Sequence, residues 1–236
     1  MKIFIYGNEE QQKEIKSINS PGKYVFTFKN KLPENDDYKN HDVFLLLSDF
    51  SGWTAGEDTN RGELRAVSSP PMAGRINFTL FENKPVLINA VTETLSELNL
   101  PSNVSRINGW PGFLQRDIWE IASNDVQRIE SIFKGFGRKI FFVKDEPGFV
   151  AARVISMIIN EAFFALGEKV STRDEIDLAM KLGTNYPQGP FEWAEKIGIE
   201  KIYFLLKKLS VKEERYLPAP TLKKLFSEET ANDFIK

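Results

Sequence analysis

The chain has 236 residues, of which 42% are hydrophobic, so it is long enough for one large domain or two small ones with a sizeable core. Its 31 Lys and Arg against 33 Asp and Glu give a net charge of -2, which provides no bulk positive field to attract nucleic acid or an acidic membrane. The lack of cysteine excludes disulfides, thiolate metal ligands and a cysteine nucleophile, and any histidine base has to be His41, the single histidine.

The start of the chain and its apolar runs bear on localisation. No apolar segment with a small-residue cleavage site opens the sequence, and no apolar run approaches the roughly 18 residues of a membrane-spanning helix. The sequence therefore predicts a cytoplasmic protein without a membrane anchor and without a metal site.

The first half of the chain alternates strands and helices. Residues 3–6, 24–28, 43–47 and 85–89 are short apolar runs that predict buried parallel strands, and the polar residues 9–17 predict the helix after the first strand. Residues 124–136 have apolar positions at helical spacing, and 139–143 supply another strand. The segment 50–75 contains several glycines and two prolines without a regular apolar period, and it is predicted to be a long surface loop.

The second half, from Pro147 onward, has only helical patterns. Residues 149–166 are apolar on nearly every side and predict a buried helix, with Asp145 expected to cap it. Capping-box spacing at 172 and 175 begins a helix over 173–182, and two further helices are expected at 191–197 and 199–209. This change of pattern predicts an α/β domain over 1–143 and an all-α domain over 144–236.

Several motifs follow one another in the helical half. A Pro-Gly-Phe-Val helix start lies within 143–153, Asn-Glu-Ala occupies 160–162, and a Gly-x-Asn-x-Pro-x-Gly-Pro loop covers 183–190. Over residues 139–226 the chain resembles the C-terminal domain of 3-hydroxyacyl-CoA dehydrogenases. The resemblance implies a Rossmann-like parallel sheet domain at the N-terminus, here shortened between its second and third strands. It also implies a homodimer formed through the C-terminal helices and a place in fatty acid metabolism.

The cofactor that the resemblance implies is NAD, but the residues for its usual pose are missing. A dinucleotide site needs Gly-x-Gly-x-x-Gly between the first strand and the first helix. Here Gly7 is the only remaining fingerprint glycine, while Glu9 and Gln12 occupy the second and third glycine positions. The positive electrostatic potential at a helix N-terminus favours an anion, and a carboxylate in the first turn already occupies the place where a phosphate would benefit from it. Gly7 is therefore interpreted as a turn residue, and no bound cofactor is expected.

The catalytic positions are also changed. The resemblance implies a histidine that takes the substrate proton, a glutamate that orients it, and nearby serine and asparagine side chains. The segment from Asn108 to Glu120 has the same length as the family's stretch from histidine to glutamate, so Glu120 is retained and Asn108 replaces the histidine. Ala152 replaces the family's asparagine, and Thr92 is the candidate serine position. An amide cannot take up a proton near neutral pH.

His41 does not replace the missing base. It precedes the third strand, at the end opposite to where ligands bind in such sheets, and is predicted to be a surface or strand-end residue. Glu120 either lines a pocket or lies in a helical turn after Pro111. Trp110, next to Asn108, is a candidate to fill the space that a substrate would use.

Three hypotheses follow for the function. The first is a 3-hydroxyacyl-CoA dehydrogenase-like protein without standard NAD-dependent activity, serving as an acyl-CoA-related binding or scaffold protein. The alternative is an active 3-hydroxyacyl-CoA oxidoreductase, acting for example on 3-hydroxybutyryl-CoA, with an altered active site that uses Glu120 as its base. The third places the function in assembly, because the apolar surfaces of 147–166 and 173–182 exceed what one small helical domain buries alone.

Overall fold

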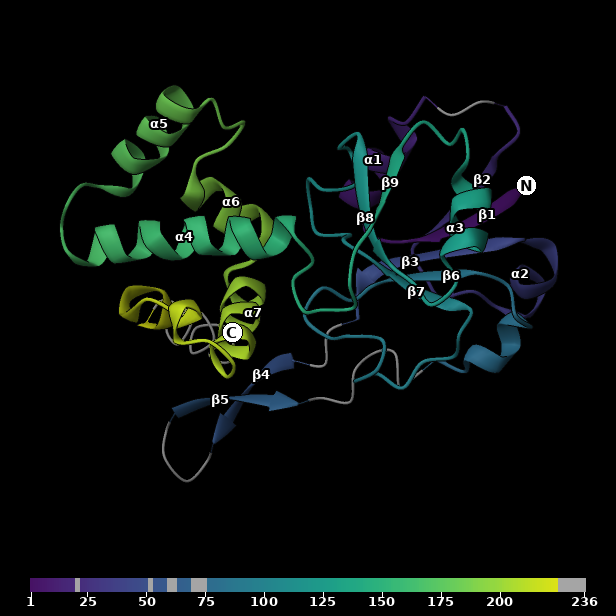
Figure 1. The fold of residues 1–236 in the computed structure, drawn as a ribbon, viewed down its shortest axis with the longest axis horizontal. Coiled ribbons are helices and arrows are strands. Elements are labelled where there is room, and N and C mark those ends of the chain that lie inside the picture. Colours follow the sequence, from purple (N-terminus) through teal and green to yellow (C-terminus); the bar gives the residue numbers. More distant parts are fainter. Residues whose placement is uncertain (20–21, 51–52, 59–62, 69–75, 225–236) are drawn as a thin grey trace. The chain divides into compact units, whose positions relative to one another are not determined.

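The computed structural model describes residues 1–19, 22–50, 53–58, 63–68 and 76–224. The chain divides into two units, the first formed by Met1–Gly52 with Pro70–Val150 and the second by Trp53–Ser69 with Ala151–Lys236. The first unit contains a parallel-dominated sheet, and the second contains helices and a short hairpin (Figure 1).

A seven-stranded sheet of order β2-β1-β3-β6-β7-β8-β9 forms the centre of the first unit (Figure 1). Strand β8 is antiparallel to β7, and the other neighbouring pairs of this sheet are parallel. The predicted α/β class is confirmed. The strands are β1 Lys2–Tyr6, β2 Val25–Lys29, β3 Val43–Asp49, β6 Val86–Asn89, β7 Val104–Ile107, β8 Ile118–Ala122 and β9 Lys139–Phe142.

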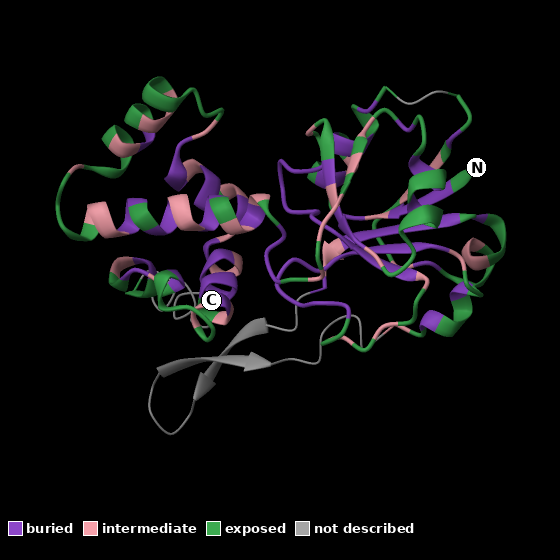
Figure 2. Cartoon of the chain, viewed as in Figure 1, coloured by how far each residue is buried: buried purple, intermediate pink, exposed green. Residues whose placement is uncertain are grey.

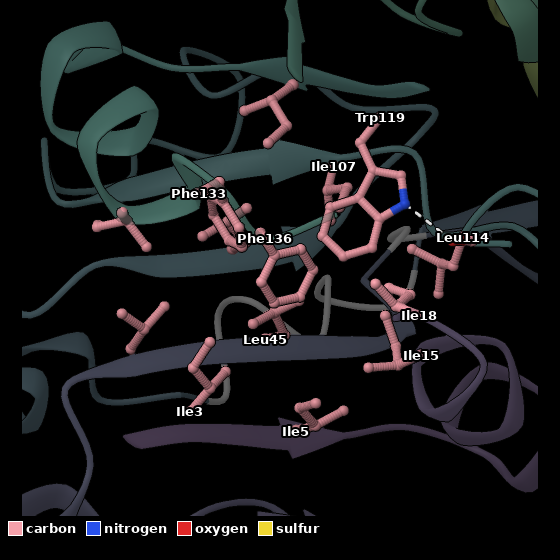
Figure 3. Packing of buried hydrophobic residues seen from close by; sticks show 14 of the residues in the cluster. Ile3, Ile5, Ile15, Ile18, Leu45, Ile107, Leu114, Trp119, Phe133 and Phe136 are labelled. Carbon is pink, nitrogen blue, oxygen red and sulfur yellow. Dashed lines mark hydrogen bonds between the residues drawn. The ribbon is translucent and has the colours of Figure 1, made fainter. Parts of the chain in front are cut away.

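Apolar side chains cover both faces of this sheet. Because neighbouring residues of a strand point to opposite faces, Ile3 joins one cluster and Phe4 the other. The helices α1 Glu9–Lys16 and α3 Val126–Phe133 supply Ile15 and Phe133 to the first cluster, where Trp119 donates its indole N–H to the Leu114 carbonyl at 2.9 Å (Figure 3).

The second cluster surrounds Phe44 and Phe81, whose rings meet edge to face with centroids 4.8 Å apart. It is bordered by α2 Asn35–Asn40 and the 3-10 helix η2 Phe78–Phe81. Figure 2 shows the central strands β3 and β6 coloured as buried over most of their length. The sheet is therefore rigidly packed, as a doubly covered parallel sheet should be.

The second unit consists of α4 Ala151–Gly167, α5 Arg173–Thr184, α6 Pro190–Ile197, α7 Ile199–Ser210 and the 3-10 helix η3 Glu214–Tyr216. Helix α4 packs against α6 and α7, and α5 packs against α6. The unit also includes an antiparallel hairpin of β4 Trp53–Asp58 and β5 Glu63–Ser68.

Residues of the sequence motifs in this unit stabilise its turns. The Asn160 carboxamide donates to the Leu217 carbonyl at 2.9 Å and accepts from the Ala219 amide at 2.8 Å. Asp177 accepts the Phe191 amide at 2.8 Å at the start of α6, and a Cβ on Gly189 would lie only 2.2 Å from its Cγ. These motif residues therefore stabilise the turns and helix starts of the second unit.

Several predicted elements differ from the structure. The predicted loop 50–75 contains the β4–β5 hairpin in its described part, while 51–52, 59–62 and 69–75 lie outside the described residues. Helix α4 begins at Ala151 rather than 149, because Gly148 and Phe149 have positive φ values of 84° and 49° that a helix does not allow. Asp145 does not cap α4; its carboxylate accepts the Leu95 amide at 2.8 Å.

Two strands of the seven-stranded sheet were also not predicted from the sequence. Strands β7 and β8 extend the sheet, and β8 places Glu120 in a strand rather than in a helical turn. Of the two positions expected for His41, the strand end is confirmed, since it lies two residues before β3, while its 6% exposure shows that a surface position is wrong. Its Nδ1 lies 3.0 Å from the Asp37 carbonyl and its Nε2 2.8 Å from the Thr27 hydroxyl, which explains how an imidazole is accommodated in the apolar cluster.

Candidate functional site

The predicted pair Asn108 and Glu120 meets where the antiparallel strands β7 and β8 join. The Asn108 backbone amide donates to the Glu120 carbonyl at 3.2 Å, and the Asn108 side-chain amide Nδ2 donates to Glu120 Oε2, also at 3.2 Å. The other carboxylate oxygen, Oε1, accepts the Val150 amide at 3.1 Å. The carboxylate is thus held by two N–H donors in a fixed orientation.

Asn108 provides an acceptor as well as a donor at this place. Its side chain is 4% exposed, and its Oδ1 has no hydrogen-bond partner among the described residues. Because an amide nitrogen donates and a carboxylate accepts, the hydrogen bond to Glu120 decides which side-chain atom of Asn108 is nitrogen and which is oxygen. The oxygen, Oδ1, therefore points away from the carboxylate. A buried acceptor of this kind costs free energy unless a donor satisfies it.

Arg116 contributes positive charge near the pair. Burial lowers the pKa of its guanidinium, while the charges of Glu120 and Glu14 act in the opposite direction. The guanidinium carbon lies 4.0 Å from the centre of the Phe113 ring, a distance at which a cation is attracted to an aromatic face. The neighbouring Trp110 is 1% exposed and therefore belongs to the packed interior.

The segment after β7 is fastened to helix α1 by Glu14. This carboxylate, 6% exposed, accepts the backbone amides of Gly112 at 2.6 Å, Leu114 at 2.9 Å and Gln115 at 3.0 Å. Three charge-assisted hydrogen bonds fix the connection between β7 and β8, and with it the relative position of Asn108 and Glu120.

Arg106 and Asp145 fix the other side of the region. Arg106, with a fully buried side chain, donates from Nε to the Ala90 carbonyl at 2.8 Å and from Nη1 to Asp145 Oδ1 at 2.5 Å. Burial lowers the pKa of this guanidinium, and the hydrogen bond and charge of Asp145 oppose the shift. The guanidinium carbon also lies 4.6 Å from the centre of the Phe149 ring. The ion pair therefore ties β7 to the connection after β9.

The remaining predicted site residues lie elsewhere in the two units. Thr92, 3% exposed, follows β6 in the first unit, and Ala152, fully buried, lies in α4 of the second unit. Gly7 follows the first strand and precedes Asn8, whose side chain caps α1 by accepting the Gln11 amide at 2.9 Å. Glu9 is exposed in the first turn of α1. Asn108 and Glu120 are the predicted catalytic positions that the structure brings into contact.

Sequence reasoning missed Gln11, Glu14 and Arg106. Gln11, Glu14, Ile15 and Ile18 recur at helical spacing, so the two polar side chains lie on the buried face of α1. That periodicity was available in the sequence. Nothing in the sequence indicates, however, which distant backbone atoms these side chains reach.

Neither a membrane helix nor a metal cluster occurs in the part of the chain that the structure describes. No described helix is long and apolar enough to cross a bilayer. Among the same residues, no group of three or more His, Asp or Glu side chains could hold a metal ion.

Comparison with protein families places the similarity in the helical unit. Residues 148–233 match the family described as 3-hydroxyacyl-CoA dehydrogenase, C-terminal domain. The 3-hydroxyadipyl-CoA dehydrogenase of Escherichia coli K12 is 42% identical over 89 residues, which are 37% of this chain and 19% of that protein. A probable 3-hydroxybutyryl-CoA dehydrogenase of Bacillus subtilis is 35% identical over 98 residues, covering 41% of this chain and 34% of that protein. The chain thus spans about a third or less of these relatives' length.

Solved structures extend the similarity to the whole fold. The (S)-3-hydroxybutyryl-CoA dehydrogenase of Ralstonia eutropha superposes with a TM-score of 0.66 over 97% of this chain and 94% of that chain, at 19% identity. A 3-hydroxybutyryl-CoA dehydrogenase of Escherichia coli K12 gives a TM-score of 0.52 at 27% identity, over 77% of this chain and 36% of that chain. The first likeness, at its low identity, concerns the fold alone.

Proposed function

Because the chain belongs through its C-terminal domain to the 3-hydroxyacyl-CoA dehydrogenase family, we propose that it is a binding or scaffold protein for acyl-CoA-type ligands without standard NAD-dependent dehydrogenase activity. The resemblance implies a histidine base at the position of Asn108. An amide neither accepts nor releases a proton near neutral pH, so the proton-transfer step of such a reaction has no group to carry it there.

The observation that supports this proposal is the Asn108–Glu120 contact. The Asn108 side-chain amide donates to the Glu120 carboxylate at 3.2 Å. The two side chains are therefore in contact, but the amide has no acid-base function. The unpartnered Asn108 Oδ1 offers an acceptor for the hydroxyl or amide N–H of a ligand. Binding without turnover is the expected behaviour of such a site.

The test measures binding and turnover separately on the full chain. Calorimetric titration with 3-hydroxybutyryl-CoA and acetoacetyl-CoA is expected to show binding without added NAD, and NADH formation from 3-hydroxybutyryl-CoA is expected to stay at background. NADH formation at an ordinary enzymatic rate, about 1 per second or more, would refute the proposal. Failure of both acyl-CoA ligands to bind at about 1 mM would refute the ligand class.

The alternative, an active oxidoreductase with Glu120 as base, makes a different prediction. Glu120→Gln would then abolish NADH formation while Lys13→Gln, an exposed substitution on α1, would leave it unchanged. The geometry favours the alternative less, because the Asn108 side-chain N–H and the Val150 backbone N–H each donate to one oxygen of the Glu120 carboxylate.

Assembly through the helical unit is a second candidate function, supported by exposed apolar side chains. Leu178 and Leu182 of α5 are 53% and 78% exposed, and Val154 of α4 is 53% exposed. Exposed apolar side chains on neighbouring turns of one helix favour a homodimer through these helices. Light scattering at micromolar concentration is expected to give twice the chain mass, and Leu182→Glu is expected to give the monomer. A wild-type monomer would contradict this candidate.

A further inference from the structure

The edge of the sheet where nucleotides bind in doubly wound folds can be located from the strand order. The chain passes from β1 to β2 on one side and then returns to β3 on the other, so the winding reverses between β1 and β3 (Figure 1). Ligands of such sheets bind outside the carboxyl ends of the strands at this reversal. In this chain those ends are Gly7, directly after β1, and the residues from Leu47 to Asp49 of β3.

A side chain of the protein occupies this position. Gln11 is 3% exposed, and its Nε2 donates to the Leu47 carbonyl at 2.5 Å and to the Gly109 carbonyl at 2.9 Å. Its Oε1 accepts the Asn8 amide at 3.1 Å. Both N–H groups and the oxygen of the carboxamide are therefore used, and they join β1 and α1 to the ends of β3 and β7.

The side-chain amides of two other residues, Asn89 and Gln12, form similar hydrogen bonds along the same edge of the sheet. Asn89, at the end of β6, donates to the Leu47 carbonyl at 3.0 Å and accepts the Gly109 amide at 3.0 Å. Gln12 Nε2 donates to the Gly7 carbonyl at 2.9 Å and to the Lys29 carbonyl at 3.0 Å, joining β1 to β2. Side-chain amides thus connect the carboxyl ends of five neighbouring strands.

Space and polarity at this edge are both unsuited to a pyrophosphate. A Cβ on Gly7 would lie 2.9 Å from Gln11 Oε1 and 3.2 Å from Leu47 Cβ, so the space beside this glycine is already filled by protein atoms. If Gln11 moved away, the groups uncovered would be the carbonyl oxygens of Leu47 and Gly109. Carbonyl and phosphate oxygens are both hydrogen-bond acceptors, and hence they repel.

From these contacts we infer that the nucleotide crevice of this sheet is a closed structural joint whose occupant is the Gln11 side chain, and that NAD does not fit it. The joint replaces a ligand site by a set of internal hydrogen bonds. The inference does not rest on the proposed function, because it concerns the edge of β1 and β3 and not the Asn108–Glu120 pair.

The test uses the full chain and two readouts, nucleotide binding and stability. Titration of the wild type with NAD and NADP up to about 1 mM is expected to give no binding heat and no shift in Tm. The variant Gln11→Met, which keeps the length of the side chain but removes its donors, is expected to lower Tm by several degrees. It is also expected to speed amide hydrogen exchange in 46–49 and 108–112. Lys13→Met, on the exposed side of the same helix, is the matched control and is expected to leave Tm and the amide hydrogen exchange of these segments unchanged.

Three results would overturn the inference. Saturable NAD or NADP binding to the wild type below 1 mM would show that the crevice is open. A Gln11→Met variant as stable as the Lys13→Met control would show that the joint contributes nothing. If Gln11→Met does not fold, the wild-type carboxamide protons of Gln11 decide by NMR: slow exchange supports the joint, and exchange as fast as that of an exposed glutamine overturns it. NAD binding without turnover would refute this inference and leave the proposed function intact.

Discussion

The substitution Glu14→Gln tests the attachment of the site segment to helix α1. The carboxylate accepts one backbone amide on Oε1 and two on Oε2. A glutamine can keep its oxygen toward Leu114 and Gln115, but its NH2 group would then face the Gly112 amide. That leaves a buried N–H without an acceptor, at a cost of about 1–3 kcal/mol, and weakens two charge-assisted bonds by about 1 kcal/mol each.

The sum is a loss of about 3–5 kcal/mol, which corresponds to a fall in Tm of about 6–20 °C for a chain of this size. Urea denaturation followed by tryptophan fluorescence should show a lower midpoint at an unchanged slope, and hydrogen exchange should accelerate in peptides covering 109–117. The control is Lys13→Gln, which changes an exposed residue of the same helix. A Glu14→Gln variant within about 0.5 kcal/mol of this control would refute the reasoning.

Other substitutions test the site and the helical unit. Asn108→His is expected to leave NADH formation at background, since the nucleotide crevice stays closed; measurable NADH formation would contradict this. Arg106→Met removes the cationic partner of the Asp145 carboxylate, which keeps its bond from the Leu95 amide; because that carboxylate is 29% exposed, the expected loss is about 2–4 kcal/mol, below the value for a fully buried pair, as measured by urea denaturation. The pKa of Glu175 is lowered from 4.5 chiefly by the hydrogen bond from the Ser171 hydroxyl, so its stabilising contribution is complete above pH 4.5 and is lost as the pH falls through the lower folded value. Glu175→Gln should therefore flatten the acid side of the stability profile measured by circular dichroism, and an unchanged profile would count against the capping role.

Much of the fold could be predicted from local patterns. Strands β1, β3 and β6 were found because each is a short apolar run, and α5 because Thr172 and Glu175 form the expected capping box. Strand β7 was missed because Ser105 and Arg106 make it appear polar, although they are 1% and 0% exposed. The burial of Arg106 depends on Asp145, a residue distant in sequence, and local periodicity contains no information on such a pair.

The candidate site was predictable to a similar extent. The equal length of the segment from Asn108 to Glu120 predicted their relation, and the antiparallel pairing of β7 and β8 explains why that spacing matters. The role of Gln11 was not predicted, because polar residues in a first helical turn ordinarily face solvent. Its burial follows from carbonyl groups on β3 and on the segment after β7, which come together only in the folded sheet.

The close approach of Gly7 and Gln11 also restricts how this sequence can change. A Cβ at position 7 would lie 2.9 Å from Gln11 Oε1, while a smaller residue at position 11 would remove the Gln11 donor from the Gly109 carbonyl and leave Asn89 as the side-chain donor to the Leu47 carbonyl. The close approach of Gln11 thus requires a glycine at position 7 independently of any nucleotide. Replacement of Gly7 should be better tolerated after Gln11 has been replaced by a smaller residue, so the two positions are expected to be epistatic.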